Sequence, residues 1–131
     1  MLSSDPGLIK KLRIASGQSR LIVNAPEGYA FLAAENQPRT NPVGEKLDFG
    51  LLFVTSVAVL EKSFPGFAAQ IKFDGILWVA YPKKSSGAAA DINRDAGWEV
   101  VFQAGFRPVT QISIDSTWSA LRFRPAGQVG K

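Results

Sequence analysis

The chain has 131 residues, 46% of them hydrophobic and 20% charged, and it contains neither cysteine nor histidine. This composition excludes disulfides and thiolate metal sites, and it removes histidine as a general base or metal ligand. The net charge of +4 is dispersed along the chain, which disfavours a nucleic-acid partner. The length is typical of one domain, so we expect residues 1–131 to form a single domain. The apolar runs are too short to span a bilayer, which predicts a cytoplasmic location and no membrane partner.

Local sequence signals divide the chain into alternating strands and helices. Asp5-Pro6 is typical of a helix start, Asp91 is expected to cap a later helix, and Gly105 is placed where a helix ends in a glycine. Apolar, β-branched runs bounded by turn residues predict the strands. In chain order we predict a helix over 5–13, a strand over 19–24, a helix over 29–35, a loop over 36–46, a strand over 47–54, a helix over 56–73 broken at Pro65-Gly66, a strand over 76–81, a helix over 91–104, and strands over 109–114 and 119–124.

This alternation predicts an α/β fold: a Rossmann-like, mostly parallel sheet of five or six strands, with the first three strands in sequence order. The last two strands are too close together for a crossover, so we expect them to form a C-terminal antiparallel hairpin. Strands that are apolar on both sides need cover on both faces. We assign the helices over 56–73 and 91–104 to one face and those over 5–13 and 29–35 to the other. If the latter are too small, a homodimer must supply the cover.

In open parallel sheets, ligands bind outside the carboxyl ends of the strands. Those ends are followed here by the segments Asn24–Gly28, Thr55-Ser56 and Pro82–Gly87, and the hairpin turn Asp115–Trp118 is expected at the same edge. These segments come from distant parts of the chain. We therefore predict that they meet at one edge of the sheet and form a ligand site there.

The loop after the third predicted strand has the groups of an anion site. Lys83, Lys84, Ser85, Ser86 and Gly87 supply two ammonium groups, two hydroxyls and a flexible glycine ahead of a helix start. Arg94 could add a bidentate donor. The alternative is a solvated, capped loop, and the order of residues is not that of a P-loop. The predicted ligand-site residues are Asn24, Glu27, Gly28, Lys83, Lys84, Ser85, Ser86, Gly87, Arg94 and Trp118.

Two other groups of residues have both a functional and a structural interpretation. Asp91 with Asp95, or Glu27 with Asp115, could hold Mg²⁺ or act as acid and base, but such residues more often cap helices and pair with neighbours. We accordingly predict no metal site and no catalytic residue. Trp118 is expected at a turn and is a candidate for stacking on a ligand. The other two tryptophans are expected in the core, and they are Trp78 and Trp98.

Two resemblances follow from longer stretches of sequence. The strand over 47–54, the helix to Phe73 and the run Lys72–Val79 are together similar to the second half of a class I S-adenosylmethionine-dependent methyltransferase. The segments 77–87, 94–98 and 115–125 resemble a family of small bacterial proteins of unknown function, over about residues 17–125. Both resemblances imply a truncated, methyltransferase-like scaffold. The glycine-rich cofactor turn of the methyltransferases is replaced here by Asn24–Gly28, in which one glycine remains.

These observations favour a non-catalytic module on a degenerate methyltransferase-like scaffold. We expect it to bind a small anionic ligand or a protein partner at the predicted edge and to need no cofactor. The alternative is a divergent S-adenosylmethionine-dependent methyltransferase that holds its cofactor through Asn24, Glu27 and the neighbouring loops.

Overall fold

A computed structural model describes residues 10–13, 20–25, 47–83, 91–92, 97–115 and 117–129. The predicted helix over 29–35, the loop over 36–46 and most of the predicted helix over 5–13 lie outside the described residues. Within the described part of the chain, no helix has the length and apolarity needed to cross a membrane.

The described residues form one five-stranded sheet in the order β1-β2-β3-β5-β4. β1 pairs with β2 and β2 with β3 in parallel, whereas β3 pairs with β5 and β5 with β4 antiparallel. The first three strands are therefore in sequence order, as predicted, and the C-terminal hairpin is confirmed. The strands are β1 (Arg20–Val23), β2 (Leu47–Phe53), β3 (Ile71–Pro82), β4 (Phe106–Ser113) and β5 (Trp118–Pro125).

The prediction of a mostly parallel, Rossmann-like sheet is wrong, because two of the four strand pairings are antiparallel. The second hairpin strand, β5, lies between β3 and β4 and pairs with both. Burial explains this placement. In β5, Leu121 and Phe123 are buried on one face of the sheet and Ala120 is buried on the other. In β4 no residue is fully buried, so β4 occupies the solvent-exposed edge.

Helix α2 (Val57–Ala69) is continuous across Pro65, so the predicted break at Pro65-Gly66 is wrong. Proline removes one backbone hydrogen bond of a helix. The buried side chains Phe64 and Phe67 flank Pro65, and their packing against the sheet holds the helix together there. Strand β3 begins at Ile71, soon after α2 ends at Ala69, whereas the predicted strand begins at Ile76.

Helix α3 (Glu99–Gln103) is shorter than the helix predicted over 91–104. Gly105 follows its C-cap with φ +94°, which confirms the predicted glycine at the helix end. Asp91 has a different role from the one predicted. Its Oδ1 accepts a hydrogen bond of 2.8 Å from the backbone N–H of Val57, the first residue of α2. Asp91 therefore contributes to the N-terminus of α2, where Ser56 also accepts from the Val59 N–H at 3.2 Å.

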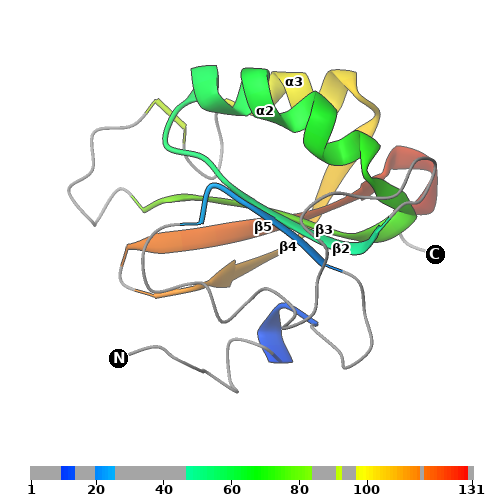
Figure 1. The fold of residues 1–131 in the computed structure, drawn as a ribbon, viewed down its shortest axis with the longest axis horizontal. Coiled ribbons are helices and arrows are strands. Elements are labelled where there is room, and N and C mark those ends of the chain that lie inside the picture. The colour runs from blue at the N-terminus through cyan, green and yellow to red at the C-terminus, as the bar shows by residue number, and fades with distance from the viewer. Residues whose placement is uncertain are drawn as a thin grey trace.

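The prediction of helices on both faces is also wrong for the described residues. Helices α2 and α3 lie over the same face of the sheet, as predicted (Figure 1), and their buried residues Leu60, Phe64 and Val101 belong to one core with Leu52 and Phe123 of the strands. The second face carries a separate core. Among the described residues outside the sheet, residues 10–13 cover this second core, with the Leu12 side chain fully buried in it. The two predicted core tryptophans are confirmed, because Trp78 and Trp98 are only 1% and 3% exposed.

Candidate functional site

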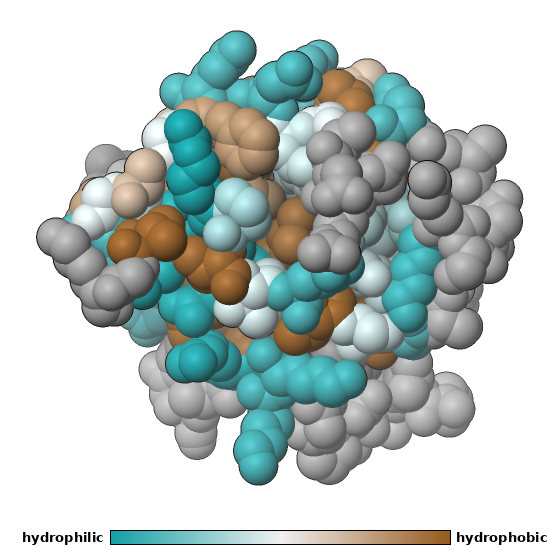
Figure 2. Space-filling view, turned by 180° about the vertical axis from the view of Figure 1, so that it is seen from behind, coloured by the Kyte–Doolittle hydropathy of each residue, from teal (hydrophilic) through white to brown (hydrophobic). Residues whose placement is uncertain are grey.

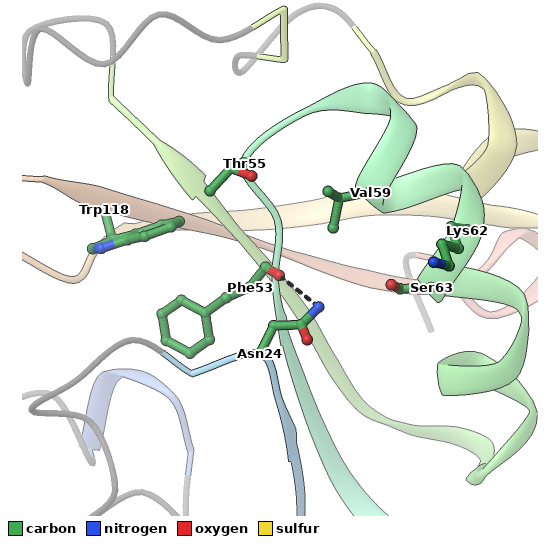
Figure 3. A pocket seen from close by; sticks show the side chains of 7 residues that line it. All are labelled: Asn24, Phe53, Thr55, Val59, Lys62, Ser63 and Trp118. Carbon is green, nitrogen blue, oxygen red and sulfur yellow. Dashed lines mark hydrogen bonds between the residues drawn. The ribbon is translucent and has the colours of Figure 1, made fainter.

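A pocket of about 620 Å³ lies at the carboxyl ends of β1 and β2 (Figure 3). Its wall combines the residue after β1, the end of β2, one side of α2 and the start of β5, which are distant from one another in the sequence. The pocket is thus located at the sheet edge where the sequence predicts a ligand site. The lining residues are Asn24, Phe53, Thr55, Val59, Lys62, Ser63 and Trp118.

Asn24 links the ends of the two parallel strands at the base of the pocket. Its backbone has φ +61°, a left-handed conformation that asparagine tolerates better than most residues. The side-chain Nδ2 donates a hydrogen bond of 3.4 Å to the backbone carbonyl of Phe53 (Figure 3). The amide oxygen of Asn24 takes no part in this bond.

Trp118 is held in place by the turn that precedes it. The Asp115 Oδ1 accepts hydrogen bonds from the backbone N–H groups of Thr117 at 2.8 Å and of Trp118 at 2.9 Å. The Trp118 ring packs edge-to-face on Phe53, with ring centroids 5.2 Å apart. Phe53 is buried, whereas Trp118 is only half-buried and keeps part of its ring accessible. Asp115, considered above as an acid or base, therefore serves as the acceptor that shapes this turn.

Helix α2 supplies the polar wall that sequence reasoning missed. Val59, Lys62 and Ser63 have the spacing i, i+3, i+4 and so share one side of the helix. This side is adjacent to the buried stripe that contains Leu60 and Phe64. Lys62 is exposed, and no described residue pairs with its ammonium group. The helical spacing of these three residues could be seen in the sequence. It did not indicate a site, because exposed lysines are common on amphipathic helices.

Lys83 lies at the same edge of the sheet but does not line the pocket. Its Nζ donates a hydrogen bond of 2.6 Å to the Ser113 Oγ, and its backbone N–H donates to the Thr117 carbonyl at 2.8 Å. The Lys11 Nζ donates to the Ser113 carbonyl at 3.3 Å. Lys83 thus fastens the end of β3 to the end of β4 and the hairpin turn.

The structure brings two predicted site residues, Asn24 and Trp118, into one pocket. The others, apart from Lys83, lie outside the described residues. They are Glu27, Gly28, Lys84, Ser85, Ser86, Gly87 and Arg94. Asp95 lies outside them as well, so neither candidate carboxylate pair lies wholly within the described residues. Within the part of the chain that is described, no three acidic side chains gather as metal ligands would.

Comparison with known proteins finds no relative of this chain. No family model, no curated protein and no solved structure matches the chain. The resemblances to methyltransferases and to a family of small bacterial proteins therefore stay predictions.

Proposed function

We propose that this protein is a binding module that takes a small anionic ligand in the pocket between Asn24, Lys62 and Trp118. The observation that carries the proposal is the pocket itself. Its volume of about 620 Å³ is within the range of roughly 300–1,000 Å³ that is usual for small-molecule sites. It also lies at the carboxyl ends of parallel strands, where ligands of open sheets commonly bind.

The polar groups of the pocket favour an anion. Lys62 supplies a positive charge, while Thr55 and Ser63 supply hydroxyl donors. None of the described lining residues is a carboxylate, so none of them would repel a negative group. General acid–base chemistry most often uses histidine or a carboxylate, and the described lining offers neither. This composition supports binding rather than catalysis.

The surface of the molecule supports a small ligand over a protein partner on the side that Figure 2 shows. Hydrophobic side chains there lie in small patches separated by hydrophilic ones. Protein partners more often dock on larger continuous apolar patches. The pocket therefore supports a small ligand more strongly than this surface supports a protein partner.

A thermal-shift screen tests the proposal. The compounds are inorganic phosphate, nucleotides, S-adenosylmethionine and S-adenosylhomocysteine, because the last two address the alternative of a divergent methyltransferase. A ligand at a hundred times its Kd adds about 2.7 kcal/mol to the free energy of unfolding. We expect stabilisation by an anionic compound and little by S-adenosylmethionine.

The variant Lys62→Gln links any stabilisation to the pocket. It should reduce the shift caused by the anionic compound, whereas Lys10→Gln, an equally neutralising change at an exposed position outside the pocket, should not. Failure of every anion to stabilise the protein, or a shift that Lys62→Gln leaves intact, would refute the proposal. Stabilisation by the two methionine compounds alone would favour the methyltransferase alternative.

A further inference from the structure

We infer that the ligand of this pocket is a planar aromatic anion, with its ring against Trp118 and its negative group at Lys62. This inference rests on the proposed function because it concerns the same pocket. It follows from the distribution of aromatic and polar side chains along the wall of the pocket. Phe53 and Trp118 lie toward one end of the pocket, Lys62 and Ser63 on α2 lie toward the other, and Asn24 lies between them (Figure 3).

The aromatic end is organised before any ligand binds. Two hydrogen bonds to Asp115 hold the backbone around Trp118, and the ring leans edge-to-face on Phe53, which is 1% exposed. A half-buried ring that is fixed in this way offers a stacking surface, and little entropy is lost when a second ring packs on it. A planar ring uses this surface better than a flexible chain does.

The polar end has the complementary chemistry. The Lys62 ammonium group has no partner among the described residues, and the Ser63 hydroxyl adjoins it on the same side of α2. Glu61 does not line the pocket, because it follows Val59 by two residues and so lies about 200° from it around the helix, whereas Lys62 and Ser63 follow Val59 by three and four residues. A carboxylate or phosphate at this end would therefore meet one positive charge and hydroxyl donors.

The size of the pocket favours an anion with an organic part. At about 30 Å³ for each water molecule, a volume of about 620 Å³ corresponds to roughly twenty waters. An inorganic phosphate ion would fill only a small part of this space. A ring that carries an anionic group can contact both ends at once.

Isothermal titration with three matched compounds tests the inference. The compounds are 2-naphthylacetate, its neutral amide 2-naphthylacetamide, and decalin-2-ylacetate, which keeps the charge but has a saturated ring system. We expect 2-naphthylacetate to bind best, the amide to bind about fivefold more weakly through loss of the ion pair, and the saturated acid about fivefold more weakly through loss of stacking. Adenosine monophosphate is titrated in parallel. Tighter binding of adenosine monophosphate than of 2-naphthylacetate would indicate a nucleotide as the ligand, and the reverse would indicate an aromatic carboxylate.

Two variants assign the effects to residues. Lys62→Gln should remove the difference between 2-naphthylacetate and its amide, and Trp118→Leu should remove the difference between the aromatic and saturated acids. Lys10→Gln should change neither difference. Equal binding of the aromatic and saturated acids, or of the acid and the amide, would overturn the inference, as would no binding of the aromatic acid. These results are independent of the proposed function. That proposal stands if any anion in the thermal-shift screen stabilises the protein in a way that depends on Lys62, and it fails if no anion does.

Discussion

The indole Nε1 of Trp78 donates a buried hydrogen bond of 3.0 Å to the backbone carbonyl of Leu12, 66 residues away along the chain. Both side chains are buried in the core on the second face of the sheet. The bond satisfies a buried donor and a backbone acceptor, and it fastens residues 10–13 to the central strand β3. The N-terminal part of the chain is thus a component of the core.

Replacing Trp78 by phenylalanine should therefore destabilise the protein strongly. The Leu12 carbonyl would lose its partner, and the smaller ring would leave a cavity, so we expect the free energy of unfolding to fall by about 2–4 kcal/mol. Urea unfolding followed by circular dichroism measures the change. Trp118→Phe is the control, since Trp118 is half-buried and its loss should matter less. Equal midpoints for Trp78→Phe and the wild type would show that the bond contributes little.

Two substitutions at Asn24 separate its backbone from its side chain. Both Asn24→Gly and Asn24→Ala remove the hydrogen bond to Phe53, but only glycine keeps an unstrained backbone at φ +61°. We expect the alanine variant to be less stable than the glycine variant by about 1 kcal/mol. Thermal unfolding of the two proteins gives this difference directly, and an alanine variant as stable as the glycine variant would contradict the left-handed conformation.

Gly50 and Gly66 form a matched pair because the same substitution should have opposite effects at the two positions. A Cβ on Gly50, in β2, would lie 2.6 Å from the Ile71 Cδ1 and 2.8 Å from the Phe67 Cζ, whereas a Cβ on Gly66 would meet nothing within 4 Å. Gly50→Ala should thus cost about 1–3 kcal/mol by overpacking. Gly66→Ala, in helix α2, should stabilise by about 0.5–1 kcal/mol. Chemical denaturation of both variants tests the pair, and a destabilised Gly66→Ala would argue against the open space beside α2.

Asp91 should stabilise the N-terminus of α2, although 34 residues separate it from Val57. Loss of a carboxylate acceptor at a helix start typically costs about 1 kcal/mol, which we expect for Asp91→Ala. Asp91→Asn retains an oxygen acceptor and should lose less. Hydrogen exchange at the Val57 amide provides a local readout: it should quicken most in the alanine variant. Unchanged exchange in that variant would mean that the amide does not depend on Asp91.

Part of the fold could be predicted because it depends on local sequence. Apolar, β-branched runs indicated all five described strands, although β3 and β4 begin earlier in the structure than predicted. The short separation of the last two strands predicted their hairpin, and Gly105 was recognised from its position after a helix. The candidate site was partly predictable too, because the rule that ligands bind at strand ends places Asn24 and Trp118 at one edge.

The remaining features depend on contacts between distant residues. Local sequence does not say which hairpin strand pairs with β3; the greater burial of β5 decides it. Asp91 has the sequence signature of a helix cap, but its partner is the N-terminus of another helix. The polar wall formed by Lys62 and Ser63 depends on the packing of α2 over the sheet, which brings these two residues to the same pocket as Asn24.

The amino-acid sequence by itself determined where the strands form and which end of the sheet could bind a ligand, since both depend on local hydrophobic pattern and chain direction. The tertiary structure alone decided the position of β5 between β3 and β4 and brought Lys62 and Trp118 to the wall of one pocket. The physical reason is that local pattern specifies whether a segment is buried, whereas its neighbours are selected by packing and hydrogen bonding across the whole chain.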